Sequence, residues 1–369
     1  MILVEELFNT LKKNKISFYA GVPDSTLKNL SKSFDKLSNS KHIVAVNEGS
    51  AISIGIGYYL STKKIPCIYM QNSGLGNAIN PLISIAHKNV YSIPLLLIIG
   101  WRGSPNKKDE PQHITKGKIT PKLLELLGID YCKLGSKKDL ITLDKLIKKS
   151  YKQKRIAACL IAKDVLKSAT KINLSKKNKL LPSRKDFLLS LLKNIKKGSK
   201  IISTTGYTSR ELMQIRKEEK LFNSNVFYMV GGMGHASAVS LGFSLYTKKQ
   251  VICVDGDGSI LMHLGSLLTN GKIGNRNLKH ILLNNNSHES VGGQITMAKE
   301  VDFNKLSNSL GYKNYFKISK KDKIVPTIKK FLNSNGPSFL EILISVGSMG
   351  NLARPKNLIK IRDDFSKTI

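Results

Sequence analysis

The chain reads Val251-Ile-Cys-Val-Asp-Gly-Asp-Gly-Ser259, and further on it reads Ile281-Leu-Leu-Asn-Asn-Asn286. Each stretch begins with a short apolar run, which is typical of a buried strand, and ends in polar or glycine residues. The intervening residues 259 to 283 number twenty-five, which is enough for one helix and a return to the neighbouring strand. Open α/β sheets bind ligands at the carboxyl ends of their strands. An aspartate and an asparagine oxygen are therefore expected side by side at one sheet edge.

This pair of oxygen-bearing residues suits a magnesium ion held on a diphosphate. Mg²⁺ prefers one or two carboxylates together with phosphate oxygens, and the glycines around Asp257 let a ligand approach the backbone closely. An isolated Asp-Gly-Asp-Gly sequence is more often an ordinary turn. The asparagines at the expected distance favour the metal site.

The composition describes a chain of ordinary globular size with a large excess of basic side chains. Its 369 residues are enough for two or three domains. The formal net charge of +35 points toward nucleic acid, but the excess is almost all lysine, spread over helices and loops. The sequence has no zinc-finger spacing and no RNA-binding signature. We expect a solvated lysine surface that attracts an anionic substrate, and no nucleic-acid partner.

The cysteines and the apolar runs indicate a cytoplasmic protein that is not bound to a membrane. The four cysteines lie scattered and mostly inside apolar runs, as buried thiols of a reducing compartment do: Cys67, Cys132, Cys159 and Cys253. The longest apolar stretch, 93–99, is far shorter than the roughly 20 residues that span a bilayer. The amino terminus carries acidic residues and lacks a signal-peptide pattern.

Short β-branched runs alternate with amphipathic stretches along the chain, which is typical of parallel α/β units. The expected strands are 17–20, 43–46, 65–70, 92–100 and 157–162, and then 200–203, 226–229, 250–255, 280–283 and 339–344. A lysine-rich stretch interrupts this rhythm before Pro182, and Ser183 is then expected to be the N-cap of a helix. The sequence predicts two doubly wound parallel-sheet domains, 1–167 and 183–369. A linker over 168–182 joins them, with no middle domain.

In the first expected domain, two acidic residues follow strands. Glu48 opens a helix rich in glycine and small apolar residues. An isolated glutamate at a helix start usually complements the helix dipole. In apolar surroundings, however, such a carboxyl can hold or lend a proton near neutral pH. Asp24 follows the first strand, where it either caps the next helix or faces the site.

A cation follows the most apolar strand of this domain. Arg102 offers a planar fork that suits a carboxylate or a phosphonate, although a solvated loop arginine is the plainer interpretation. Lys108 and His113 come shortly afterwards, in a stretch expected to be a loop before a helix at 121–127.

In the second expected domain, glycine-bearing turns also follow the strands. Gly206 lies in the turn 203–208, and Met233 stands between glycines in the turn 231–235. Met233 is either core filler or a wedge beneath a bent ligand. After the asparagines, residues 287–294 form a polar, glycine-containing loop that is expected to lie over the diphosphate.

Taken together, these motifs resemble the thiamine diphosphate-dependent decarboxylases. The likeness runs over nearly the whole chain and in the same order. It is greatest to the phosphonopyruvate decarboxylases, with the sulfopyruvate decarboxylases as nearest relatives. The motifs are Gly-Val-Pro-Asp-Ser (21–25), Asn-Glu-Gly (47–49), Gln-Asn-Ser-Gly-Leu-Gly-Asn (71–77), Trp-Arg-Gly (101–103), Lys-Asp-Glu-Pro-Gln-His (108–113), Gly-Gly-Met-Gly-His (231–235), Gly-Asp-Gly-Ser (256–259) and Ser-His-Glu-Ser-Val-Gly-Gly-Gln (287–294).

The resemblance implies a role for each matching position. Glu48 corresponds to the carboxyl that bonds the aminopyrimidine ring of thiamine diphosphate and promotes its activation. Asp257, Asn285 and the carbonyl of Ser287 correspond to Mg²⁺ ligands. Further cofactor contacts are implied for Gly206, Gly231, Met233, Gly256, Gly258, Ser259, Asn285 and His288.

One position departs from the pattern of these decarboxylases. Asn286 stands where they usually have glycine, which leaves the metal ligand open between Asn285 and Asn284. Asparagine tolerates left-handed backbone geometry, so the turn itself is expected to survive.

The resemblance also implies a reaction, the decarboxylation of 3-phosphonopyruvate to phosphonoacetaldehyde and CO₂ in phosphonate biosynthesis of the 2-aminoethylphosphonate type. Asp24 and His113 are candidates for moving protons, and Asp24, Ser25, Arg102 and Lys108 are candidates for binding the substrate. The cofactor would bridge domains of two subunits, which implies a dimer or a larger homo-oligomer. Two alternatives stay open: a sulfopyruvate decarboxylase, and a non-catalytic basic protein that binds nucleic acid or a partner.

Overall fold

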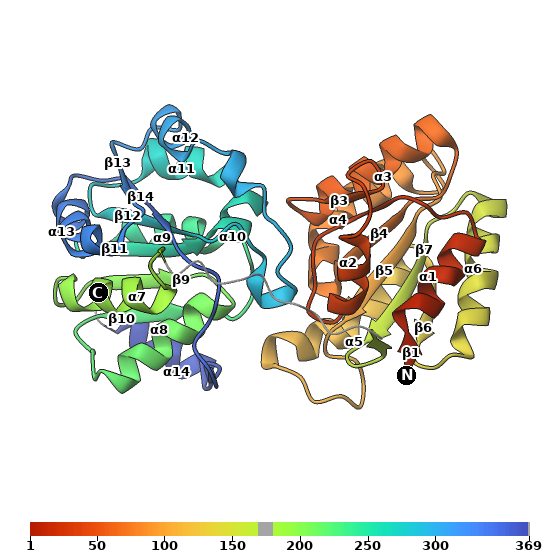
Figure 1. Cartoon of the computed structure of the whole chain (residues 1–369), viewed down its shortest axis with the longest axis horizontal. Helices are drawn as coiled ribbons and strands as arrows, with labels where there is room; N and C mark the ends of the chain where they lie inside the picture. Colours follow the sequence, from red (N-terminus) through yellow and green to blue (C-terminus); the bar gives the residue numbers. More distant parts are fainter. Residues whose placement is uncertain (169–179, 368–369) are drawn as a thin grey trace. The chain divides into compact units, whose positions relative to one another are not determined.

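The computed structural model describes residues 1–168 and 180–367, which form two compact α/β units (Figure 1). In the first unit, six parallel strands pair in the order β3-β2-β4-β5-β7-β6. Their bounds are β2 (Tyr19–Gly21), β3 (His42–Val44), β4 (Cys67–Gln71), β5 (Leu96–Trp101), β6 (Asp130–Leu134) and β7 (Ala157–Ala162). A short parallel pair, β1 (Ile2–Leu3) and β8 (Leu166–Lys167), lies apart from this sheet.

Helices cover both faces of the first sheet, which confirms the doubly wound prediction (Figure 1). Successive strand residues point to opposite faces: Tyr69 and Ile98 enter one core, and Ile68 and Ile99 enter the other. Because both faces are buried, the strands are apolar at consecutive positions. The helices are α1 (Val4–Lys13), α2 (Lys28–Phe34), α3 (Glu48–Thr62), α4 (Leu75–Pro81), α5 (Pro111–Leu126) and α6 (Asp139–Gln153), with the short turns η1 (Asn72–Gly74) and η2 (Leu82–Ala86).

The second unit repeats this plan with six parallel strands in the order β10-β9-β11-β12-β14-β13. Their bounds are β9 (Lys200–Ser203), β10 (Asn225–Tyr228), β11 (Val251–Gly256), β12 (Leu278–Asn284), β13 (Asn314–Ile318) and β14 (Ser338–Leu343). The helices are α7 (Arg184–Asn194), α8 (Tyr207–Glu218), α9 (Ala236–Ser244), α10 (Asp257–Met262), α11 (Ser266–Ile273), α12 (Phe303–Ser309), α13 (Ile324–Asn333) and α14 (Leu358–Ser366). Short turns are η3 (Glu289–Val291), η4 (Ala298–Glu300) and η5 (Lys321–Lys323).

The strands that end at Gly256 and Asn284 are direct neighbours in the second sheet. β11 pairs with β12 in parallel, and Gly256 lies opposite Leu283 at their carboxyl ends. Asp257 begins α10 directly after β11, and Asn285 follows β12. The register therefore brings both residues to one sheet edge, as the spacing predicted.

Two edge strands and one helix start were not predicted. β6 and β13 lie at sheet edges, where they are only partly buried and mix polar with apolar residues. The loop prediction for 108–113 was wrong in its second half, because α5 begins at Pro111. Proline suits the first turn of a helix because its fixed φ is helical and its missing N–H would have no partner there. Pro121, expected to begin a helix, lies inside α5.

The start of the second unit confirms one prediction and leaves another open. The side chain of Ser183 accepts a hydrogen bond from the backbone N–H of Asp186, whose side chain reaches back to complete a capping box. Residues 169–179 of the expected linker lie outside the described residues, so the boundary 168–182 stays a prediction.

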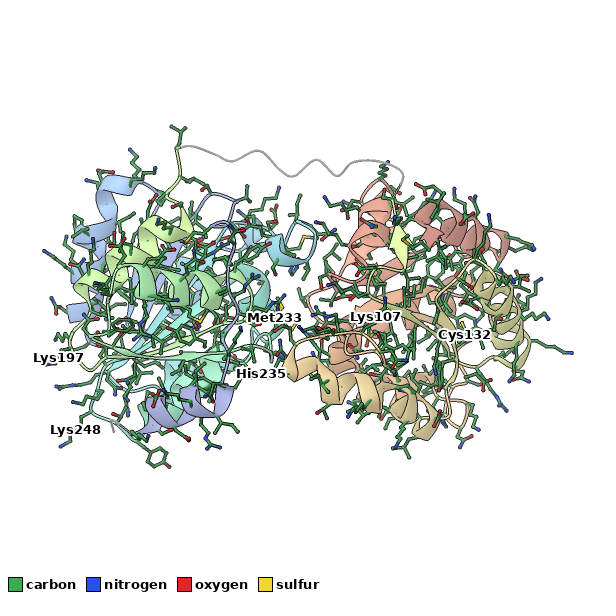
Figure 2. The ribbon with its side chains drawn as sticks, turned by 90° about the horizontal axis from the view of Figure 1, so that it is seen from below. Lys107, Cys132, Lys197, Met233, His235 and Lys248 are labelled. Atoms are coloured by element: carbon green, nitrogen blue, oxygen red, sulfur yellow. The ribbon has the colours of Figure 1, made fainter. Side chains whose placement is uncertain are left out.

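The surface and the thiols agree with the composition. Lys107, Lys197 and Lys248 are exposed and come from three separate loops (Figure 2). All four cysteines are buried and carry free thiols. Within residues 1–168 and 180–367, every helix is too short or too polar to cross a lipid bilayer.

Candidate active site

Glu48 is the first residue of α3, and its carboxyl is buried. The preceding Asn47 caps the helix, because its side-chain oxygen accepts the backbone N–H of Ser50 at 2.8 Å. Oε2 of Glu48 accepts a hydrogen bond of 2.8 Å from the side-chain amide of Asn77 on α4. A Cβ atom at Gly74 would overlap the Glu48 carboxyl. Only glycine at position 74 leaves room for this carboxyl.

The charge of Glu48 acts on a cation of α5. Burial lowers the pKa of the half-buried Lys116, and the charge of Glu48 acts in the opposite direction. His113 is buried one turn earlier on the same helix. Residues three apart on a helix share a face, so the unpredicted start of α5 places His113 and Lys116 on one side of a rigid element.

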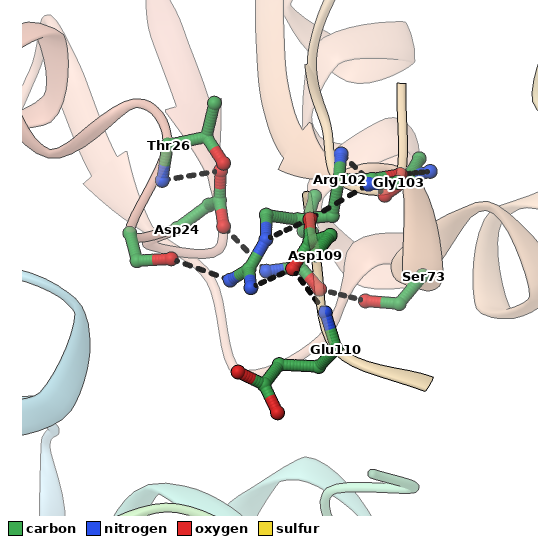
Figure 3. Close-up of polar contacts among 10 residues, drawn as sticks. Asp24, Thr26, Ser73, Arg102, Gly103, Asp109 and Glu110 are labelled. Carbon is green, nitrogen blue, oxygen red and sulfur yellow. Dashed lines mark hydrogen bonds and ion pairs between the residues drawn. The ribbon is translucent and has the colours of Figure 1, made fainter. Parts of the chain in front are cut away.

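Asp24 follows β2 and is fully buried. Its Oδ2 accepts the backbone N–H groups of Thr26 at 3.0 Å and Leu27 at 3.3 Å, and its Oδ1 accepts the Gln71 amide at 2.5 Å (Figure 3). Burial raises the pKa of Asp24, and the Gln71 hydrogen bond and the Arg102 charge offset only part of that effect. The helix-capping interpretation is wrong, because α2 begins at Lys28 with Leu27 as its N-cap, and Asp24 instead caps the turn before that helix. The role of Asp24 in the site stays a prediction.

Arg102 does not present its whole fork to an incoming anion. Its Nε and Nη2 donate to the two carboxylate oxygens of Asp109 at 2.8 and 2.5 Å (Figure 3). Burial alone would raise the pKa of Asp109, but the hydrogen bonds from Arg102 and two backbone N–H groups hold that pKa well below its usual range. The Nη1 edge of Arg102 lies 3.2 Å from the hydroxyl of Ser25. Lys108 is exposed in the same loop.

In the second unit, Asp257 and Asn285 aim oxygens at one point. The backbone N–H of Ser287 donates to Oδ2 of Asp257 and to Oδ1 of Asn285, each at 3.0 Å. Oδ2 of Asp257 also accepts the hydroxyl of Thr296 at 2.6 Å. Burial raises the pKa of Asp257 to about 6, although these hydrogen bonds act to lower it. The structure thus brings together the three residues expected to hold the metal.

The neighbouring asparagine points elsewhere. Asn284 is buried at the end of β12, where its side-chain amide donates to Glu341 at 2.9 Å. Its oxygen accepts the backbone N–H of Asn286 at 3.2 Å. Asn286 has φ of +53°, which confirms that asparagine here takes the left-handed turn in place of glycine.

Two other loops meet at Ser259, which follows β11. Its hydroxyl accepts the backbone N–H of Gly234 at 3.0 Å and lies 2.9 Å from the hydroxyl of Thr204. Gly234 adopts φ of +88° directly after Met233, and its missing Cβ leaves space for the ring of His263. Met233 is labelled in Figure 2 in the loop after β10. These contacts join the carboxyl ends of β9, β10 and β11.

Gly258 lies between two of the predicted cofactor contacts. A Cβ atom there would overlap the imidazole of His288 and would stand 3.4 Å from the terminal methyl of Met233. Burial lowers the pKa of His288 to about 4, so its ring is neutral at physiological pH. Gly206 takes φ of +90° at the start of α8, Gly256 ends β11, and Gly231 lies in the loop after β10.

Several residues of the site had no role assigned from the sequence. Asp109 stands seven positions after Arg102 in the same polar stretch, which is a signal for an ion pair. Asn77, Gln71 and Gly74 belong to a motif that was recognised without roles for its members. Thr296 carried no signal, because it joins Asp257 only through the path of the chain after β12.

The donor set fits a magnesium diphosphate. The carboxylate of Asp257 and the amide oxygen of Asn285 are hard ligands, as Mg²⁺ requires. The raised pKa of Asp257 shows a buried carboxyl whose hydrogen bonds do not fully compensate its burial, which a divalent cation would do. Glycine at 258 leaves the backbone beside it open to a phosphate oxygen.

Comparison with known proteins gives the same family over nearly the whole chain. The thiamine pyrophosphate enzyme N-terminal TPP binding domain matches residues 1–122, and the corresponding C-terminal TPP binding domain matches residues 203–342. Phosphonopyruvate decarboxylase of Streptomyces viridochromogenes is 33% identical over 96% of this chain and 92% of its own length. That of Streptomyces hygroscopicus is 32% identical over 96% and 91%. Sulfopyruvate decarboxylase of Methanosarcina acetivorans is 28% identical over 99% and 97%. The chain therefore belongs to the phosphonopyruvate decarboxylase family of thiamine pyrophosphate enzymes.

Proposed function

We propose that this protein is a lyase that decarboxylates 3-phosphonopyruvate to phosphonoacetaldehyde and CO₂, as a step of phosphonate biosynthesis. The observation that carries the proposal is the match to two phosphonopyruvate decarboxylases over 96% of the chain, at 33% and 32% identity. The sulfopyruvate decarboxylase of comparable coverage is 28% identical.

Thiamine diphosphate, when bound, supplies the electron sink that accepts the electron pair left by CO₂. Glu48 would hold its aminopyrimidine end, because this buried carboxyl begins a helix and is oriented by Asn77. Asp257, Asn285 and the Ser287 carbonyl would hold Mg²⁺ on the diphosphate. Met233 and Gly258 would line the bend of the cofactor, with His288 above the glycine.

The substrate would lie at the carboxyl ends of β2 and β5. Arg102 offers its Nη1 edge and Ser25 its hydroxyl to the phosphonate oxygens. The pairing with Asp109 neutralises the charge of Arg102, so net positive charge comes from the exposed lysines of the same loop, Lys107 and Lys108. The raised pKa of Asp24 suits a group that exchanges protons during the reaction, with His113 on α5 as the second candidate.

The alternative substrate is sulfopyruvate, whose sulfonate carries one negative charge fewer than an ionised phosphonate. The contribution of Lys108 distinguishes the two substrates, because a missing cation costs more against a doubly charged group. Replacing Lys108 by Met is expected to lower kcat/KM for phosphonopyruvate more than for sulfopyruvate.

We also propose a homo-oligomer, at least a dimer, in the cytoplasm. The helices α3 and α4 border a surface hollow of about 650 Å³, whose lining joins small polar residues with Ile54, Pro81 and Ile85 and suits close packing of a second copy. The buried free thiols agree with a reducing compartment.

The experiment is CO₂ release from phosphonopyruvate by the purified protein, with and without added thiamine diphosphate and Mg²⁺, and in competition with sulfopyruvate. We expect release that depends on both additions and a higher kcat/KM for phosphonopyruvate. The Glu48→Gln variant should fold and lose nearly all turnover. A protein that releases no CO₂ from either acid but shifts DNA in a salt-sensitive way would refute the proposal and favour a basic binding protein.

A further inference from the structure

A buried arginine ties the candidate metal loop to the rest of the second unit. Arg184 is the first residue of α7, and its side chain is only 6% exposed. Its Nη1 donates to Glu211 on α8 at 2.9 Å, and its Nη2 donates to Glu289 at 2.7 Å. Such an ion pair is costly to bury and is stable only when its partners satisfy each other.

Glu289 connects this ion-pair network to the candidate metal site, because it contacts both Arg184 and Asn285. Its Oε2 accepts Arg184 and also the side-chain amide of Asn285, the latter at 3.0 Å. Its Oε1 accepts the backbone N–H of Gly347, in the segment after β14. Three donors from three parts of the chain thus hold one carboxylate in place.

This arrangement decides which end of the Asn285 amide faces Asp257. An unanchored amide can present either its oxygen or its NH₂ group, and only the oxygen binds a cation. Because the NH₂ group donates to Glu289, the oxygen is directed to the backbone N–H of Ser287, which also donates to Oδ2 of Asp257, so the two ligand oxygens lie beside one another. Residues beyond the metal ligands commonly fix ligand orientation in this way.

Asn284 offers a natural comparison within the same turn. Its amide also donates to a buried carboxylate, that of Glu341, but its oxygen is turned to the backbone of Asn286. Glu341 lies on β14 and is held by Tyr315 at 2.6 Å and Lys317 at 3.2 Å. The two asparagines are thus anchored by different carboxylates, only one of which directs an oxygen toward Asp257.

We propose that Glu289, held by Arg184, is a positioning residue that makes Asn285 a ligand of the diphosphate-bound metal ion. The inference rests on the metal site proposed above but not on the identity of the substrate. It also explains why Asn285, and not Asn284, is the ligand.

The test is the affinity of the metal-free protein for Mn²⁺ in the presence of thiamine diphosphate and without substrate. Free Mn²⁺ is followed by electron paramagnetic resonance, and a titration without protein corrects for Mn²⁺ bound to the cofactor alone. Glu289→Gln keeps the shape but loses one acceptor oxygen, and its Kd for Mn²⁺ is expected to rise about 10- to 100-fold. Turnover at saturating metal should recover most of its wild-type value.

Glu341→Gln is the matched control, because it removes the carboxylate that anchors the neighbouring asparagine. Its Kd for Mn²⁺ should stay close to wild type, even where its thermal stability falls. Wild-type affinity in Glu289→Gln, or an equal loss in both variants, would overturn the proposal. If Glu289→Gln does not fold, Arg184→Lys is measured by the same criterion, since lysine cannot bridge Glu211 and Glu289 as the fork does. Metal binding without CO₂ release would count against the proposed substrate only.

Discussion

Replacing Gly74 by Ala should inactivate the enzyme through Glu48 without unfolding it. Gly74 has φ of −79° and ψ of −10°, which alanine adopts without strain. A Cβ there would approach the Glu48 carboxyl more than an ångström closer than the 3.4 Å at which ordinary contact begins. The side chain of Glu48 is flexible and can retreat, so the fold survives. Retreat of the carboxyl breaks its 2.8 Å hydrogen bond with Asn77.

The expected effect on activity follows from that displacement. A shift of about 1 Å in a group that positions a reactant costs roughly 100-fold in rate, which corresponds to about 2.7 kcal/mol of activation free energy. Alanine restricts the unfolded chain, which adds roughly 0.4–1 kcal/mol to the free energy of unfolding. The broken hydrogen bond of the buried Glu48 carboxyl costs about 1–3 kcal/mol. We therefore expect a net loss of at most about 3 kcal/mol, which leaves the variant folded while its activity falls roughly 100-fold.

Gly76→Ala supplies the control. Gly76 lies in α4, two residues along, and a Cβ there meets nothing within 4 Å. The assay is kcat/KM for CO₂ release beside urea unfolding, with Mn²⁺ binding as a check on the metal site. We expect Gly76→Ala to match wild type in activity. The reasoning would be refuted if Gly74→Ala turned over as fast as Gly76→Ala, or if it lost activity only by unfolding.

Three further outcomes are expected. Arg102→Lys should raise KM for phosphonopyruvate on the order of 10-fold or more, as measured by initial-rate kinetics. The reason is that lysine cannot donate two hydrogen bonds to Asp109 and still reach Ser25. Removing divalent metal with EDTA should abolish CO₂ release, and added Mg²⁺ should restore it. Burial lowers the pKa of Lys279 from 10.5 to about 8. The unfolded chain therefore binds the extra proton between pH 8 and 10.5, and the free energy of unfolding should rise with pH there by roughly 1 kcal/mol per unit. Urea titrations of Lys279→Met should lack that rise.

Much of the fold followed from sequence because both sheets are buried on two faces. Ile98 and Ile99 enter opposite cores, so the strand is an unbroken apolar run in the sequence. Such a short apolar run is readily recognised as a buried strand. The spacing between Gly258 and Asn284 predicted the parallel pairing of β11 with β12, which needs a crossover of a dozen or more residues. The expectation of a single helix in this crossover was wrong, because the segment forms two short helices, α10 and α11. The edge strands β6 and β13 lacked this signal, because each has residues in contact with solvent.

The sequence predicted the motif residues of the candidate site. It did not predict the residues of other elements that hold them in place. Glu48, Asp257 and Asn285 stand at strand ends that the sequence pattern located. Their partners come from other elements: Asn77 reaches Glu48 from α4, and Thr296 reaches Asp257 from beyond β12. Spacing along a chain does not encode such contacts, because they depend on how loops pack in three dimensions.

The buried charged residues of the second unit differ in whether they have a charged partner. This difference separates residues that support the structure from residues that are available to bind a ligand. Arg184 sits between two carboxylates, so each charge in that network has a charged partner and the network holds its shape. Asp257 is as deeply buried, but the groups that lower its pKa are a hydroxyl and backbone N–H groups, none of which carries a full charge. A carboxylate left in that state gains more from a divalent cation than one that already has an arginine. This division agrees with the proposed roles, in which Asp257 binds the metal and Arg184, through Glu289, directs Asn285 toward it.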